Sequence, residues 1–282
     1  MRMILRIAAF LFLVASGMAS AGPLGPDGTP GRTLPGKFVW FDLATEDLPR
    51  ARAFYGAVFG WKFREVEGAP AGYTLIENGG GKIGGMFRRS RVKDARAGAH
   101  WLSLISVPDP QAAAGLVRAR GGSVVLAPTT VPGRGTHAVF RDPQGAYFGV
   151  LAAPGGDPPD DAVVDGDVFW LDLFTPDPAK AAAFYAELAG YEVGEGKTRT
   201  GQTRHYLVNG SVARAGVIAQ QSAGLAPAWL PYILVDDVPG TLHRVDHAGG
   251  RVIIAPRTDY LGGNLAVIAD PNGGIVGIVN WP

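Results

Sequence analysis

The chain has 282 residues, of which 47% are hydrophobic and 18% are charged, and its formal net charge is +1. This balance is typical of a globular protein of about two domains, and it gives no sign of a nucleic acid or an anionic membrane surface as partner. The sequence contains no cysteine, which excludes disulfides, thiolate nucleophiles and cysteine metal ligands.

The first 21 residues have the pattern of a secretory signal peptide, with Arg2 and Arg6 before an apolar run at 7–14 and small residues at 19–21. That run is too short for a bilayer, which takes about 20 residues. We therefore expect a periplasmic or secreted protein with no stable membrane span once the signal is removed. Residues 22–36 hold Gly or Pro at nine of fifteen positions and predict a flexible tether.

The next segment predicts one structural unit. Residues 38–44 read as a strand, Asp47 caps a helix whose apolar face runs from 51 to 59, and Gly60 ends it. Short strands follow at 61–66, 73–76 and 83–87. The same order then returns: a strand at 101–107, a helix at 111–119 capped by Asp109, and strands at 123–127, 137–140 and 146–151, with a turn at Asp142-Pro143-Gln144-Gly145. Each half reads β-α-β-β-β.

The whole unit is then repeated. WFDLATEDLPRARAFYGAVFGW at 40–61 returns as WLDLFTPDPAKAAAFYAELAGY at 170–191, offset by 130, and Asp142-Pro143 returns as Asp270-Pro271, offset by 128. A register held over this length indicates a duplicated domain rather than a solenoid. We expect domains at 37–153 and 166–282, with a linker at 154–165 rich in Pro, Gly and Asp. The fold class is α+β, with four β-α-β-β-β modules.

These pieces resemble the vicinal oxygen chelate superfamily, which includes glyoxalase I, bleomycin-resistance proteins, fosfomycin-modifying enzymes and extradiol dioxygenases. The likeness covers nearly all of 37–282 and is carried by DLATEDLPRARAFYGAVFGW, DLFTPDPAKAAAFYAELAGY, RDPQGAYFGV and ADPNGGIVGIV. It implies that paired modules curl their sheets into half-open β-barrels, called cups here, with helices outside and a ligand within. It also implies a monomer, because two domains in one chain replace the homodimer of single-domain relatives.

The resemblance implies a divalent metal in each cup, held by His or Glu side chains. The matching positions hold other residues: Trp40, Leu102 and Gly149 in the first domain, and Trp170, Leu230 and Gly277 in the second. An indole N–H only donates, and Leu and Gly side chains offer a cation nothing. We therefore expect no cofactor. The alternative is a displaced divalent metal held by Asp42, His100 and His137.

Aromatic and apolar residues are expected to line the cups instead. Trp40 and Trp170 share a strand face with Asp42 and Asp172, Tyr147 and Tyr232 would add to the walls, and Gly149 and Gly277 would leave room. The sequence leaves open whether the indoles fill the cups or line ligand-holding clefts. It supports two hypotheses: a metal-free binder of an aromatic or amphipathic small molecule, or a glyoxalase- or dioxygenase-type enzyme with displaced metal ligands.

Other aromatic and histidine residues are assigned to structural positions. Trp101 and Trp229 have the opposite strand parity and are expected to face the helices. His243 and His247 lie at i, i+4 on a predicted helix and are expected at the surface.

Overall fold

The computed structural model describes residues 24–66, 72–89, 98–160, 163–198, 201–220 and 225–281. The predicted signal peptide lies outside these ranges. In the first repeat, one module consists of β1 (Phe38–Thr45), α1 (Leu48–Phe59), β2 (Lys62–Glu65), β3 (Thr74–Asn78) and β4 (Gly81–Arg88). The other consists of β5 (His100–Ser106), α2 (Pro110–Ala119), β6 (Ser123–Val131), β7 (Gly135–Arg141) and β8 (Tyr147–Ala152).

The second repeat has the same order. Its first module consists of β9 (Val168–Thr175), α3 (Pro178–Ala189), β10 (Glu192–Lys197), β11 (Thr203–Asn209) and β12 (Val212–Ala219). Its second consists of β13 (Ala228–Leu234), α4 (Val238–His247), β14 (Arg251–Ile254), the 3₁₀ turn η2 (Leu261–Gly263), β15 (Leu265–Ala269) and β16 (Ile275–Val279). The predicted α+β fold of four β-α-β-β-β modules is confirmed.

Local signals set the helix ends as predicted. The Asp47 carboxylate accepts a hydrogen bond from Arg50 N at 3.1 Å, which satisfies one of the free N–H groups at the start of α1. Gly60 ends the helix with φ of 74°, a left-handed conformation that glycine adopts without a Cβ clash. Asp177 and Gly190 repeat both features on α3.

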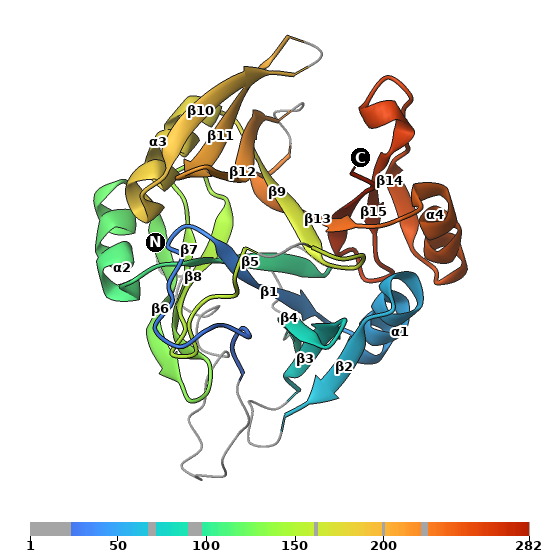
Figure 1. The fold of residues 1–282 in the computed structure, drawn as a ribbon, viewed down its shortest axis with the longest axis horizontal. Coiled ribbons are helices and arrows are strands. Elements are labelled where there is room, and N and C mark those ends of the chain that lie inside the picture. Colours follow the sequence, from blue (N-terminus) through green and yellow to red (C-terminus); the bar gives the residue numbers. More distant parts are fainter. Residues whose placement is uncertain are drawn as a thin grey trace, which may run out of the picture.

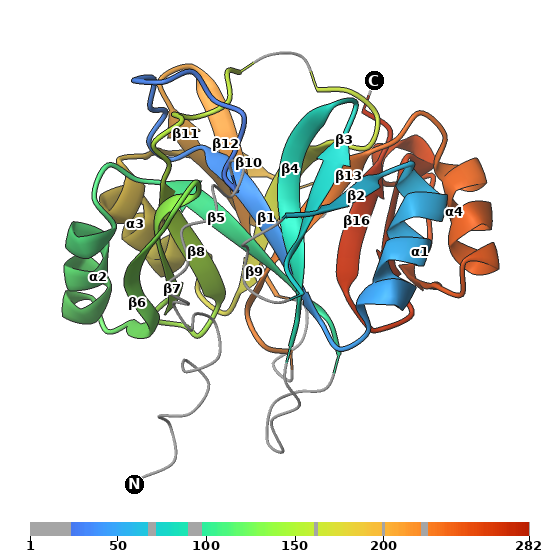
Figure 2. The same cartoon turned by 90° about the horizontal axis from the view of Figure 1, so that it is seen from below.

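Each repeat forms one eight-stranded sheet, ordered β2-β3-β4-β1-β5-β8-β7-β6 in the first and β10-β11-β12-β9-β13-β16-β15-β14 in the second. The leading strands of the two modules pair antiparallel at the centre of each sheet. Helices α1 and α4 lie together at one end of the molecule and α2 and α3 at the other (Figures 1 and 2). Helices from different repeats therefore pack against each other, and both large hydrophobic cores draw residues from both repeats.

Two buried contacts, which we call the inter-repeat latches, join the repeats through the sequence motifs. Tyr55 on α1 donates to Asp270 Oδ2 at 2.9 Å and accepts from Trp101 Nε1 at 3.0 Å. Burial and the neighbouring carboxylate hold the pKa of Tyr55 well above its ordinary value, so the phenol stays a donor. The equivalent set is Tyr185, Asp142 and Trp229. Trp101 and Trp229 thus face the helices, as predicted.

The Gly- and Pro-rich segment predicted as a flexible tether lies against the protein over its described part, 24–36. Leu24 N and Gly25 N donate to Gly133 O at 2.9 and 3.1 Å. Leu34 N donates to Asp157 in the linker at 2.6 Å. The composition predicted flexibility because a Gly- and Pro-rich segment can bury little apolar area. In the structure this segment is held by hydrogen bonds instead. Within the described residues, no helix has the length and apolar character needed to cross a bilayer.

Candidate functional site

One row of side chains crosses the face of each sheet that is turned away from the helices. In the first repeat the row is Leu126, Val139, Gly149, Leu104 and Trp40. In the second it is Ile254, Val267, Gly277, Tyr232 and Trp170. We call these two faces cup 1 and cup 2. Sequence comparison placed Leu102 and Leu230 at metal-ligand positions. They lie outside the rows, two residues before Leu104 and Tyr232 on the same strands, where they pair with Asp42 and Asp172.

The two glycines in these rows do not leave room for a ligand, contrary to expectation. A Cβ on Gly149 would lie 2.6 Å from Leu104 Cγ, and a Cβ on Gly277 would lie 2.0 Å from Tyr232 Cδ1. Each glycine therefore accommodates a neighbouring side chain of the same cup. The alternating strand pattern predicted the face of these glycines, but not which side chain leans over them.

Cup 1 is filled by a buried polar network on an apolar base. Asp42 Oδ1 accepts from Trp40 Nε1 at 2.9 Å and from the Tyr73 hydroxyl at 2.8 Å. Arg134 donates to Asp42 Oδ2 at 2.5 Å and to the Tyr73 oxygen at 2.8 Å. Burial alone would lower the pKa of Arg134, but Asp42 and Tyr73 raise it, so the guanidinium stays charged. With Trp40 fully buried, cup 1 holds its own side chains in place of a ligand.

A hairpin closes cup 1. Arg134 lies in the tip between β6 and β7 and reaches back over the Trp40 ring, with 5.6 Å between Cζ and the ring centroid. His137, on β7 of the same hairpin, is 3% exposed. Burial, followed by the charge of Arg134, lowers the pKa of His137 from 6.5 to about 4. The imidazole is therefore neutral at physiological pH.

Cup 2 contains the same kinds of group in a different arrangement. Asp172 accepts from Trp170 Nε1 at 2.8 Å and from Arg204 Nη2. Arg204 Cζ lies 5.7 Å from the Trp170 ring centroid and 5.3 Å from that of Tyr206. Burial raises the pKa of Asp172, and Arg204 opposes that rise. Burial and Asp172 together hold the pKa of Tyr232 well above its ordinary value, so its phenol is neutral.

The guanidinium of each cup comes from a different place in the repeat. Tyr73 and Arg204 are equivalent, since each lies against the glycine that pairs with the buried aspartate. Arg134 matches Gly262, at the offset of 128. In cup 2 the arginine comes from β11, and Arg257, in the connection between β14 and β15, bonds to Asp259 and not to Asp172. Sequence analysis missed Arg134, Tyr73, Arg204 and Tyr206, although a mismatch such as Arg134 against Gly262 was visible in the aligned repeats.

The two cups differ in exposure at equivalent positions. Leu126, at the end of the row in cup 1, is 9% exposed, whereas Ile254 in cup 2 is 51% exposed. Trp40 is fully buried, whereas Trp170 is partly exposed. Ile275 in cup 2 and its equivalent Tyr147 in cup 1 are similarly exposed, at 45% and 47%, so the contrast does not extend to this strand end. It lies at the hairpin end of the row and at the tryptophan, which cup 1 buries and cup 2 presents to solvent.

The remaining predicted residues, apart from His137 beside Arg134, lie outside these networks. Tyr147 is 47% exposed and its ring lies 5.2 Å from Arg141 Cζ, so it does not join the cup 1 network. His100 is exposed at the start of β5, whereas His137 is buried. His243 and His247 are exposed on α4, as predicted, with 3.0 Å between their Nε2 atoms.

The described residues do not fit a divalent metal in either cup. The rows offer Trp, Leu, Tyr and Gly where a cation needs carboxylate or imidazole donors. Asp42 and Asp172 are each bound by an arginine. Over the ranges that the structure describes, no three His, Asp or Glu side chains gather as a metal site would need, so Asp42, His100 and His137 are not assembled into one.

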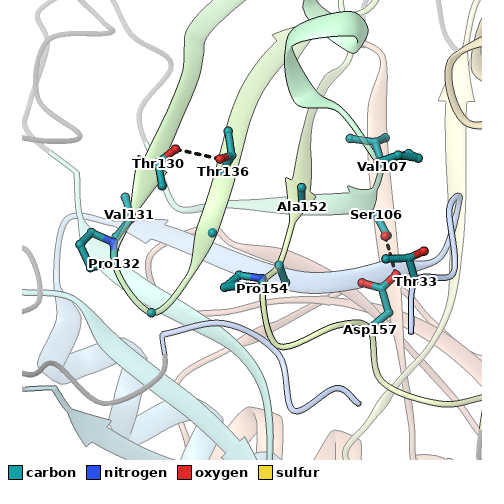
Figure 3. Close-up of a pocket in the computed structure, with 14 residues that line it drawn as sticks. Thr33, Ser106, Val107, Thr130, Val131, Pro132, Thr136, Ala152, Pro154 and Asp157 are labelled. Atoms are coloured by element: carbon teal, nitrogen blue, oxygen red, sulfur yellow. Dashed lines mark hydrogen bonds between the residues drawn. The ribbon is translucent and has the colours of Figure 1, made fainter. Parts of the chain in front are cut away.

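A separate cavity of about 510 Å³ lies where the β6–β7 hairpin, the 24–36 segment and the linker meet (Figure 3). Asp157 lies on its wall, and its carboxylate accepts from Ser106 Oγ at 2.5 Å and from Leu34 N at 2.6 Å. Thr130 and Thr136 bond to each other at 2.8 Å. These polar groups are engaged with one another where the three segments meet.

Comparisons with known proteins agree with this fold. The glyoxalase/bleomycin resistance protein/dioxygenase superfamily matches residues 37–150, and the glyoxalase-like domain family matches 168–278. The putative glyoxylase CFP32 of Mycobacterium bovis is 27% identical over 242 residues, 85% of this chain and 93% of that protein. The anthracycline biosynthesis protein DauV of Streptomyces sp. is 29% identical over 255 residues, 86% of this chain and 92% of that protein.

Solved structures share the architecture. The Mn(II)-bound glyoxalase from Novosphingobium aromaticivorans superposes with a TM-score of 0.60 at 18% identity, over 87% of this chain and 82% of its own. A homoprotocatechuate 2,3-dioxygenase variant from Brevibacterium fuscum gives a TM-score of 0.59 at 14% identity, over 90% of this chain and 74% of its own. With both of its repeats matched, the chain belongs to the glyoxalase/bleomycin resistance protein/dioxygenase superfamily.

Proposed function

We propose that this chain binds a planar aromatic small molecule in cup 2 and needs no metal ion to do so. The observation that carries the proposal is the contrast between equivalent rows. Cup 1 is sealed over a fully buried Trp40, whereas cup 2 leaves Trp170 partly exposed and Ile254 51% exposed. Ligand sites are typically concave, largely apolar and aromatic, with a few placed polar groups, and Arg204 and Asp172 are such groups in cup 2.

The relatives support an aromatic ligand. DauV and DnrV of Streptomyces are both named anthracycline biosynthesis proteins, each 29% identical to this chain over 255 residues. Anthracyclines are built on flat, fused ring systems of the shape that indole and phenol rings stack against. The proposal transfers this ligand shape, and not a reaction, to the present chain.

We also propose where the protein acts and in what oligomeric state. The leader over 1–21 would direct export, so binding would take place outside the cytoplasm. The chain would act as a monomer, since helices of its two repeats already pack together. Mass spectrometry of secreted protein would locate the mature N-terminus, and sedimentation would give the mass of the assembly.

The test is calorimetric titration of the mature, EDTA-dialysed protein with anthraquinone-2-sulfonate, a soluble tricyclic probe. One molecule should bind per chain. Ile254→Asp should weaken binding about tenfold or more, because it places a charge at the apolar mouth of cup 2. Val193→Asp, at another exposed strand position on the helix-facing side of the sheet, is the matched control and should bind normally.

Two results would contradict the proposal. Binding unaffected by Ile254→Asp would place the ligand elsewhere. Binding that appears only after Mn²⁺, Zn²⁺ or Fe²⁺ is restored would favour the metal-dependent glyoxalase or dioxygenase alternative.

A further inference from the structure

We infer that the ligand of cup 2 carries a neutral ring oxygen, a phenol or a quinone carbonyl, and that this oxygen accepts a hydrogen bond from Arg204. The inference rests on the proposed function and specifies the chemical class of its ligand. It comes from comparing how the two arginines use their N–H groups.

In cup 1 the chain provides the phenol itself. Arg134 donates from one terminal nitrogen to Asp42 at 2.5 Å and from the other to the Tyr73 oxygen at 2.8 Å. The Tyr73 hydroxyl in turn donates to Asp42 at 2.8 Å. A phenol thus bridges the guanidinium and the carboxylate, and the side chains of Arg134 and Asp42 are 5% and 6% exposed.

In cup 2 the Tyr232 phenol bonds to Asp172, but within the described residues no hydrogen bond joins a phenol to Arg204. Arg204 itself occupies the Tyr73 position, and the part of the chain that the structure describes gives it one hydrogen-bond acceptor, Asp172. Its buried Nε lacks a partner. Nε of Arg134 also lacks a partner, so Nε does not distinguish the two arginines. They differ at the second terminal nitrogen, which Arg134 uses to bond Tyr73 and for which Arg204 has no equivalent bond to the described residues. The Arg204 side chain is 16% exposed, and an N–H group that is largely removed from water gains most from an oxygen acceptor.

The geometry and the charge around Arg204 restrict the chemical class of the ligand further. Arg204 Cζ lies 5.7 and 5.3 Å from the ring centroids of Trp170 and Tyr206, which are themselves 6.4 Å apart, so a flat ring packed against these two rings would place an in-plane oxygen near the guanidinium. Asp172 already balances the charge of Arg204, and its side chain is 3% exposed. A second carboxylate would be unbalanced, so a neutral oxygen is favoured.

The experiment compares three bicyclic probes on the metal-free protein: 2-naphthol, 2-methylnaphthalene, in which a methyl group replaces the hydroxyl, and 2-naphthoate. We expect 2-naphthol to bind about tenfold or more tighter than either, the effect of one hydrogen bond to a charged donor. In Arg204→Gln, which keeps one amide donor for Asp172, the preference over 2-methylnaphthalene should fall to about twofold. Arg257→Gln, at an exposed arginine 68% accessible, should keep the full preference.

The outcomes separate the inference from the proposed function. Equal binding of 2-naphthol and 2-methylnaphthalene would overturn the inference and leave aromatic binding standing. Tightest binding of 2-naphthoate would overturn the choice of a neutral oxygen. No binding of any probe, or of anthraquinone-2-sulfonate, would remove the proposed function itself. If Arg204→Gln fails to fold by circular dichroism, the probe ratio on the unmodified protein still decides.

Discussion

Replacing His137 with leucine, the residue at the matching position 265, should make stability less dependent on pH. The folded structure lowers the pKa of His137 from 6.5 to about 4, first through burial and then through Arg134. A group with a lowered folded pKa contributes stability that is complete above its unfolded value and is lost as pH falls toward the folded value. Between pH 7.5 and 4.5 the loss from this one residue is about 2.5 kcal/mol.

The free energy of unfolding is measured in urea at pH 7.5 and 4.5, for the natural protein and for His137→Leu. The contribution of His137 is the amount by which the change between the two pH values differs between the two proteins. Asp142, Asp172 and Asp270 have pKa values raised by burial, so they favour the folded state as pH falls through the same window. Their effect is common to both proteins and cancels. An unchanged pH slope in His137→Leu would refute the reasoning.

Three further substitutions test the packing. Arg134→Met should cost about 3–5 kcal/mol by urea unfolding, because it strands the buried Asp42 carboxylate, and Asp42→Asn in the same chain should recover part of that. Tyr55→Phe should cost about 1–3 kcal/mol by removing the latch hydroxyl between two buried partners; a cost below the error of measurement would contradict this. Gly277→Ala should lower Tm, because its Cβ would lie 2.0 Å from a ring carbon, whereas Gly115→Ala, in open space on α2, should raise it.

Much of the fold could be predicted because its signals are local or repeated. Asp47 and Gly60 mark the helix ends within a few residues of the chain, and they took those roles in the structure. The duplication was visible because whole motifs recur at a fixed offset. The strand faces of Trp40 and Trp101 followed from alternation alone, one toward the cup and the other toward the helices.

The contents of the cups could not be predicted in the same way. Arg134 lies in a turn, 92 residues from the Asp42 it neutralises, and no periodic pattern links the two. The glycines at 149 and 277 indicated space, but whether a ligand or a neighbouring side chain fills it depends on rotamers that a sequence does not display. Alternation cannot reveal that one row ends buried at Leu126 and the other exposed at Ile254, because this depends on what covers each hairpin.

The inter-repeat latches also bear on the ancestry of the chain. Tyr55 bonds to Asp270, and Tyr185 to Asp142, so each half completes the interior of the other. Fragments separated at the linker would each expose half of two cores to water, and they should recover their shape only as a heterodimer. In a fused chain a substitution falls in one copy alone, whereas in a homodimer every substitution appears twice. The two rows of this chain accordingly end at different residues, one buried at Leu126 and one exposed at Ile254.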